Sequence, residues 1–306
     1  MESFHYGNLA IAYDKEGANH YTKVTYPIRY GRFCEIKTPE YVFQFNLNGE
    51  IKSLWKYNPF TDGDIQKALG AWSQLRMNLR SLPDNGIPLK IRDFLSQIYR
   101  QDPNTLNLKS TKLHRIIGGP VSVLPPDTRH VDYDVIPLMI TDGCLYNCKF
   151  CRIKSRQSFR PRSRDNVLDQ IRQYQDFYGD NLGNYNAVFL GNHDALAAQP
   201  DLICMAATQA YEAFGFEKSR LKNPTLFLFG SVDFLLNAGN RLFDTLNQIQ
   251  MYTYVNIGLE SVDAATLSQI NKPLESHKVE DAFQMMLEKP EEFGNLLDEF
   301  LLENRL

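Results

Sequence analysis

The chain has 306 residues, of which 43% are hydrophobic and 23% are charged, and its formal net charge is −3 at pH 7. This composition is typical of a globular protein, and the length suits one large domain or two smaller ones. The slight acidic excess argues against a general nucleic-acid-binding surface, because non-specific binding to phosphates requires an excess of basic residues.

The first 30 residues contain charged side chains and no long apolar run, so they predict neither a signal peptide nor a membrane span. Five cysteines are present, and three of them fall within eight positions. The paired cysteines of a secreted disulfide framework are distributed differently. We therefore expect a cytoplasmic protein without a membrane partner, in which the clustered cysteines support metal chemistry in a reducing compartment.

A segment rich in proline and glycine, residues 118–126, separates two regions with different patterns. We place a domain boundary there, with residues 1–131 in the first domain and residues 132–306 in the second. In the first domain, two strand-like runs flank Asn48-Gly49, which predicts a β-hairpin. The runs cover residues 41–45 and 51–55, and two stretches with apolar residues at helical spacing cover residues 62–79 and 91–99. The first domain is therefore predicted to be a small α+β unit, and no group of its residues indicates a reaction.

The second domain alternates short apolar runs with helical stretches, as expected for βα units around a parallel sheet. The predicted strands cover residues 136–140, 187–190, 225–229 and 254–257, and the predicted helices between them cover residues 164–178, 200–214 and 235–249. Parallel sheets carry their chemistry at the carboxyl ends of the strands. A polar or cysteine-containing segment follows each predicted strand, so we expect these four segments to meet at one edge of the sheet.

Three cysteines follow the first of these strands at the spacing C-x3-C-x2-C, and they are Cys144, Cys148 and Cys151. Soft thiolates favour zinc or an iron–sulfur cluster. A structural zinc site normally has four protein ligands, and no fourth cysteine or histidine lies within a few residues of the trio. Three ligands would leave one iron of a cluster open to a small chelating molecule. A zinc-binding module and three unrelated buried cysteines stay as alternatives, whereas Cys34 and Cys204 are predicted to be buried and not to bind metal.

This spacing, with the aromatic residue Phe150 directly before the last cysteine, resembles the signature of the radical S-adenosylmethionine (SAM) superfamily. The resemblance implies that the cysteines hold a [4Fe-4S] cluster whose open iron binds the amino and carboxylate groups of SAM. It also implies an enzyme that cleaves SAM reductively, a 5′-deoxyadenosyl radical that takes hydrogen from a substrate, and a reductant such as flavodoxin or ferredoxin. The sequence does not identify the substrate. A non-catalytic iron–sulfur or electron-transfer protein derived from this superfamily is the alternative function.

The segment after the second predicted strand consists of Gly191, Asn192, His193 and Asp194. It resembles a variant of the glycine-rich motif that receives the SAM amino group, as found in relatives of the elongator catalytic subunit and of oxygen-independent coproporphyrinogen oxidase. Glycine lets the backbone approach a ligand closely. The alternative role for Asp194 is to cap the next helix.

The segment after the fourth predicted strand, Gly258-Leu259-Glu260-Ser261, resembles a strand end of the same relatives in which the acid lies beside SAM. A carboxylate accepts hydrogen bonds from ribose hydroxyls or from the SAM ammonium group, so Glu260 is a candidate SAM ligand. The alternative is a surface glutamate at the start of a helix near Asp263. Ser231 and Asp233, after the third strand, are further candidates, and both residue types also suit turns and caps.

Residues 149–164 contain seven basic residues and no acid. They would balance the negative charge of the cluster, and they would also attract a phosphate-bearing substrate such as RNA. A solvated run of charge is the alternative, so nucleic acid stays open as a partner without support from other residues.

The resemblance covers about residues 135–275 and implies a partial (β/α) barrel of the radical SAM type. After Glu260 the sequence shows no pattern of a fifth or sixth strand, and a helical stretch near residues 279–288 follows instead. We therefore expect an α/β protein whose partial barrel is incomplete at its C-terminal end and is preceded by the smaller α+β domain.

Overall fold

The computed structural model describes short strands between residues 4 and 37 and most of the chain from residue 63 to residue 288. The described ranges after residue 60 are 63–81, 86–100, 112–113, 115–118, 135–146, 148–149 and 158–288, with residue 108 in addition. The chain divides into two compact units, Met1–Arg115 and Ile116–Leu306. The predicted domain boundary at residue 131 lies outside the described residues, and so does the predicted hairpin around Asn48-Gly49.

The first unit contains two small antiparallel sheets and two helices. One sheet pairs β1 (Phe4–His5) with β2 (Asn8–Leu9), and the other has the order β3 (Ile11–Asp14), β4 (Tyr21–Val24) and β5 (Ile36–Lys37). Helices α2 (Gly63–Arg80) and α3 (Leu89–Tyr99) confirm the two predicted helices. The guanidinium group of Arg76 on α2 lies 5.5 Å from the ring centre of Tyr99 on α3, a cation–π contact that joins the helices.

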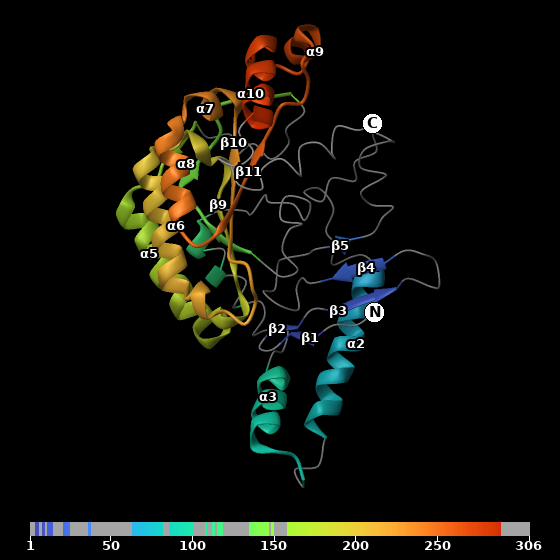
Figure 1. Ribbon diagram of the computed structural model, residues 1–306. Helices are drawn as coiled ribbons and strands as arrows, with labels where there is room; N and C mark the ends of the chain where they lie inside the picture. The colour runs from blue at the N-terminus through green and yellow to red at the C-terminus, as the bar shows by residue number, and fades with distance from the viewer. Residues whose placement is uncertain are drawn as a thin grey trace. The chain divides into compact units, whose positions relative to one another are not determined.

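A parallel sheet with the strand order β11-β10-β9-β6 forms the centre of the second unit (Figure 1). Its strands are β6 (Ile136–Leu138), β9 (Ala187–Asp194), β10 (Thr225–Gly230) and β11 (Tyr252–Ile257). In the observed register, Phe227 lies opposite Phe189 on one side and Tyr254 on the other. The three rings stack across neighbouring strands, with centroid distances of 5.8 Å and 5.5 Å. Buried apolar side chains of this kind stabilise parallel strands, which are covered on both faces.

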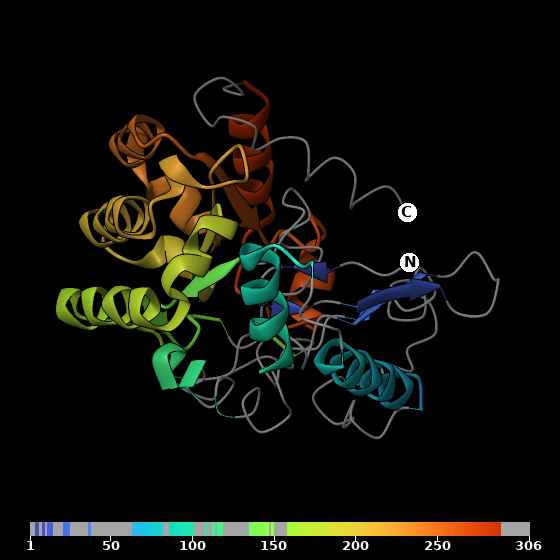
Figure 2. The ribbon, with the colours of Figure 1, turned by 90° about the horizontal axis from the view of Figure 1, so that it is seen from below.

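Three helices, α5 (Arg164–Tyr178), α6 (Pro200–Phe214) and α8 (Gly239–Gln248), lie side by side along the sheet (Figures 1 and 2). Local sequence explains where they begin and end. The hydroxyl of Ser163 accepts a hydrogen bond from the backbone N–H of Asn166 and caps α5. Helix α6 starts with Pro200 and stops at Gly215, whose φ of 66° is a left-handed conformation that favours glycine.

Two predicted elements differ from the structure. The predicted helix 235–249 is two helices, α7 (Val232–Asn237) and α8, because Gly239 has a φ of 68° and interrupts the right-handed turn. The predicted strand 136–140 ends at Leu138. Beyond this point the side chain of Gln170 on α5 takes the place of a strand partner. Its amide oxygen accepts from the backbone N–H of Met139 at 3.0 Å, and its amide nitrogen donates to the carbonyl of Met139 at 2.8 Å.

The remaining elements of the second unit are short. They are β7 (Thr141–Asp142), β8 (Arg160–Pro161), the 3-10 helices at Gly179–Asn184, Ala195–Ala197 and Phe216–Lys218, and the helices α9 (Ala264–Gln269) and α10 (Ser276–Glu288). In the described residues after Ile257 the chain forms α9 and α10 and no strand, as predicted. The second unit is therefore an α/β fold with four parallel strands, a partial (β/α) barrel. Among the described helices, none combines the length and the apolar character needed to cross a membrane.

Candidate functional site

The carboxyl end of β9 contains a bulge. Leu190 lies opposite Leu228 of β10, but the next residue of β10, Phe229, lies opposite Asp194. Three residues of β9, Gly191 to His193, therefore face no partner residue on β10. Gly191 has a φ of 79°, and a Cβ atom at this position would lie 3.2 Å from the hydroxyl oxygen of Thr141. Bulges redirect side chains beside functional sites, so the predicted turn after residue 190 is a bulge inside a longer strand.

The bulge leads to a cluster of buried acceptor oxygens at the ends of β7, β9 and β10. The backbone N–H of Ser231 donates to Asp194 Oδ1 at 3.0 Å. The other carboxylate oxygen of Asp194, the Ser231 hydroxyl and the Thr141 hydroxyl are buried and have no hydrogen-bond partner among the described residues. Burial raises the pKa of Asp194, while contacts with Ser231 and the positive charge of Lys272 oppose the rise. Buried polar groups are normally paired, so this cluster suits a ligand that donates hydrogen bonds.

Glu260, at the end of β11, forms an ion pair with Lys272. The lysine side chain is only 6% exposed, and its Nζ also donates to the carbonyl of Gly258 at 2.7 Å. Glu260 has a φ of 56°, which is unfavourable for a residue with a side chain. A Cβ atom at Gly258 would lie 2.9 Å from the Glu260 carboxylate, so glycine at this position leaves room for the ion pair. Strained backbone of this kind is often found at functional sites.

The loop between β7 and β8, residues 143–159, carries the three cysteines, and we call it the cysteine loop. Cys148 is buried, with 7% of its surface exposed, and Cys144 is partly exposed. Cys151 lies outside the described residues. Within the described part of the chain, no three His, Cys, Asp or Glu side chains gather in a group that could hold a metal ion. The complete trio of ligands therefore stays a prediction.

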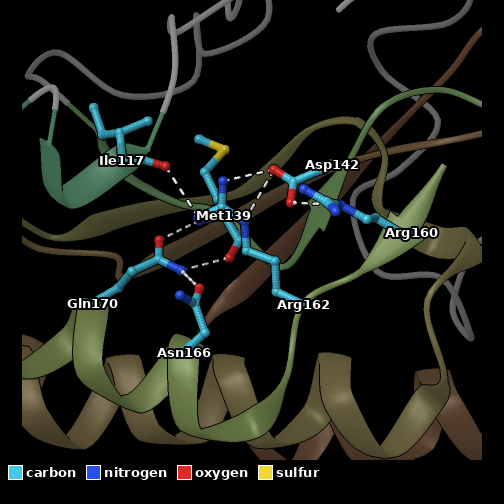
Figure 3. Close-up of polar contacts among 7 residues, drawn as sticks. All are labelled: Ile117, Met139, Asp142, Arg160, Arg162, Asn166 and Gln170. Atoms are coloured by element: carbon cyan, nitrogen blue, oxygen red, sulfur yellow. Dashed lines mark hydrogen bonds and ion pairs between the residues drawn. The ribbon is translucent and has the colours of Figure 1, made fainter. Parts of the chain in front are cut away.

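An ion pair closes the base of the cysteine loop (Figure 3). Strands β7 and β8 pair antiparallel there, and the guanidinium group of Arg162 donates to Asp142 Oδ1 from Nε at 3.1 Å and from Nη2 at 2.7 Å. Its third nitrogen, Nη1, donates to the carbonyl of Ile117 at 3.1 Å. Arg160 approaches the second oxygen of Asp142 at 3.6 Å. Two of the seven basic residues counted in the sequence thus stabilise the loop base.

The cysteine loop also makes a contact near its start, at Tyr146. The hydroxyl of Tyr146 donates to Asp233 Oδ2 at 2.9 Å, and Lys278 on α10 donates to Asp233 Oδ1 at 2.9 Å. Burial raises the pKa of Tyr146, so its hydroxyl keeps its proton at neutral pH. Burial acts to raise the pKa of Asp233 as well, but the hydrogen bonds from Lys278 and Tyr146 outweigh it and hold this pKa below its ordinary value. An ionised acceptor and a protonated donor make a strong hydrogen bond.

The structure brings some of the predicted site residues together and assigns others a different role. Asp194 and Ser231 are in direct contact. Glu260 pairs with Lys272, whose positive charge acts to lower the pKa of Asp194. Asp194 makes no side-chain capping hydrogen bond. Asp263, not Glu260, caps α9 by accepting from the N–H of Thr266. For Asn192 and His193 the structure describes the backbone and not the side chains.

Three residues of the site were not predicted from the sequence: Tyr146, Lys272 and Lys278. Arg162 was counted in the basic run, but its ion pair with Asp142 was not predicted. The partners of these four residues are 12 to 87 positions away in the chain. The available signals were weak. Tyr146 lies between two of the cysteines, and Lys272 precedes Pro273.

The described residues fit the expected cofactors. SAM carries an ammonium group and ribose hydroxyls, which are donors, and the buried oxygens of Thr141, Asp194 and Ser231 are acceptors without partners among the described residues. Cys144 and Cys148 are soft thiol donors of the kind that an iron–sulfur centre takes. The described acceptors therefore suit SAM, and two of the three expected thiols are among the described residues.

Comparisons with known proteins agree with this description. Residues 138–290, half of the chain, match the radical SAM superfamily. Among solved structures, the cobalamin-dependent SAM radical enzyme OxsB with aqua-cobalamin and SAM bound is similar with a TM-score of 0.36 and 17% identity, over 49% of this chain and 22% of that chain. The structure of OxsB with aqua-cobalamin bound is similar with a TM-score of 0.35 and 17% identity, over 48% of this chain and 21% of that chain. The chain thus spans about a fifth of the length of these structures. No curated protein matches. On the family match over half of its length, the chain belongs to the radical SAM superfamily.

Proposed function

We propose that this chain is a radical SAM enzyme in which Cys144, Cys148 and Cys151 hold a [4Fe-4S] cluster. When bound, the cluster supplies the electron that cleaves SAM, and the resulting 5′-deoxyadenosyl radical takes hydrogen from a substrate. The observation that carries the proposal is the set of buried acceptor oxygens beside the cysteine loop, which have no partner among the described residues. The reducing cytoplasm suits these thiols, and the electron comes from a reductant such as flavodoxin or ferredoxin.

The residues at the strand ends have separate roles in this proposal. Asp194, Ser231 and Thr141 accept hydrogen bonds from SAM, and the backbone of the bulge at Gly191 to His193 leaves room for its amino group. Glu260 accepts from a ribose hydroxyl or the ammonium group, and Lys272 holds its carboxylate in place. The described residues do not identify the substrate, so its chemical class is left open.

The test is anaerobic reconstitution with iron and sulfide. We expect an iron count and an electron paramagnetic resonance (EPR) spectrum typical of a [4Fe-4S] cluster, and formation of 5′-deoxyadenosine from SAM under dithionite. Replacing Cys144, Cys148 and Cys151 by alanine should abolish both. Cys204→Ala is the matched control, because Cys204 lies on α6 away from the cysteine loop. A cluster that assembles in the triple variant, or tetrahedral zinc as the native metal, would refute the proposal.

One observation favours a second candidate, a non-catalytic iron–sulfur protein. In the described residues after Ile257 no further strand extends the sheet. In this candidate the chain keeps the cluster loop and lacks a full SAM pocket. The EPR spectrum of the reduced cluster separates the two candidates. It changes on addition of SAM if SAM binds the open iron, and it does not change if the cluster only transfers electrons.

A further inference from the structure

The cysteine loop follows the strand at one edge of the sheet, yet it makes contacts with the segments after the strands at the other edge. Tyr146 reaches Asp233, in the first turn of α7 after β10. The backbone N–H of Lys149 donates to the carbonyl of Ile270, just after α9, at 2.8 Å. Helices α7 and α10 lie next to each other (Figure 1), and Lys278 of α10 bonds the same carboxylate of Asp233.

The position of Tyr146 gives this contact its importance. Tyr146 lies two residues from each of the cysteines 144 and 148, so its hydrogen bond to Asp233 restrains the chain beside both of them. Fixing the described residues at the start of this loop, 143–146 and 148–149, costs conformational entropy that contacts must offset. The hydrogen bond to Asp233 is such a contact, and Lys278 fixes the orientation of the acceptor.

We propose that Tyr146 and Asp233 are positioning residues that hold Cys144 and Cys148 where they lie in the metal-free chain, before a cluster binds. The consequence for the cluster rests on the proposed function. The restraint itself is a property of the metal-free chain and is tested without any metal.

The test measures alkylation of individual cysteines in metal-free, reduced protein, with iodoacetamide as the probe and mass spectrometry of peptides as the readout. Cys148 is buried, so its reaction requires local opening of the structure around it. Tyr146→Phe removes one hydrogen bond to a charged group. We therefore expect alkylation of Cys148 to be about tenfold faster in this variant than in the wild type. Cys204 on α6 is the internal reference, and its rate should not change.

Two further variants show whether Tyr146 and Asp233 act together. Asp233→Ala should accelerate alkylation of Cys148 by at least the same factor, since it also removes the partner of Lys278. The double variant should be no faster than Asp233→Ala alone, because both changes remove the hydrogen bond between Tyr146 and Asp233. Tyr211→Phe is the matched control. It removes an exposed hydroxyl hydrogen bond to Gln250 on the outside of the sheet, and it should leave the rate at Cys148 unchanged.

The consequence for the cluster is measured as iron loss. Reconstituted Tyr146→Phe should contain the same iron as the wild type but release it to a chelator about tenfold faster. An unchanged rate at Cys148 in both variants would overturn the proposal, and so would equal acceleration at Cys148 and Cys204, which indicates general unfolding. If the wild type binds no cluster but Tyr146→Phe still exposes Cys148 selectively, the proposed function fails and the restraint by Tyr146 and Asp233 stands.

Discussion

The ion pair at the base of the cysteine loop gives the sharpest prediction about stability. Arg162 is 11% exposed and Asp142 is 23% exposed, and the guanidinium group makes three hydrogen bonds. Arg162→Met would leave a largely buried carboxylate whose remaining ion-pair partner among the described residues is the exposed Arg160. Removing one partner of a buried ion pair costs about 3–5 kcal/mol, and the partial exposure of Asp142 lowers the expected cost to about 2–3 kcal/mol.

Arg172→Met is the matched control for this prediction. Arg172 pairs with Asp169 on the surface of α5, where the two side chains are 69% and 52% exposed. An exposed pair contributes about 0.2–1 kcal/mol, so this change should cost no more than that. For a protein of this size, each kcal/mol corresponds to about 2–4 °C in Tm. We therefore expect Arg162→Met to lower the Tm by roughly 4–12 °C and the control to lower it by at most about 4 °C.

The assay is thermal unfolding of the metal-free protein, followed by circular dichroism. Metal-free protein is needed because a bound cluster would add its own stabilisation. Equal shifts for Arg162→Met and Arg172→Met would refute the reasoning, since the difference in burial would then have no energetic effect.

Three other predictions concern the cluster of acceptor oxygens and Glu260. Gly191→Ala places a Cβ atom against Thr141 at a φ of 79° and should cost about 1–2 kcal/mol in urea unfolding; an unchanged midpoint would contradict the bulge geometry. Because burial raises the pKa of Asp194, the folded chain binds its proton more tightly than the unfolded chain, and the resulting stability is lost as pH rises from the ordinary Asp value through the raised one. Asp194→Asn removes this loss. In urea unfolding, the free energy of unfolding of the variant should therefore rise relative to that of the wild type as pH rises. A difference between the two proteins that does not change with pH would contradict the raised pKa of Asp194. Glu260→Gln should weaken SAM binding to the reconstituted protein about tenfold or more, measured by equilibrium dialysis, because a charged acceptor is lost; unchanged affinity would remove Glu260 from the SAM site.

The sequence by itself determined the elements of the second unit and the chemistry of its loop. Apolar runs placed strands β9, β10 and β11 to within a few residues, and helices α5 and α6 have the predicted bounds. These features are readable because burial imposes a local period on the chain. The C-x3-C-x2-C spacing is local in the same sense, and so are the glycine and glutamate at the strand ends.

Only the tertiary structure decided which side chains meet. Asp233 is a helix-start residue by sequence, and the fold makes it the acceptor for Tyr146, 87 positions earlier, and for Lys278, 45 positions later. Asp194 resembles a helix cap, and the bulge turns it towards Ser231 instead. The ion pair between Glu260 and Lys272 depends on the left-handed backbone conformation of Glu260, which glutamate rarely adopts. Contacts of this kind depend on the register of the sheet and on burial, which are properties of the packed fold and leave no periodic signal in the chain.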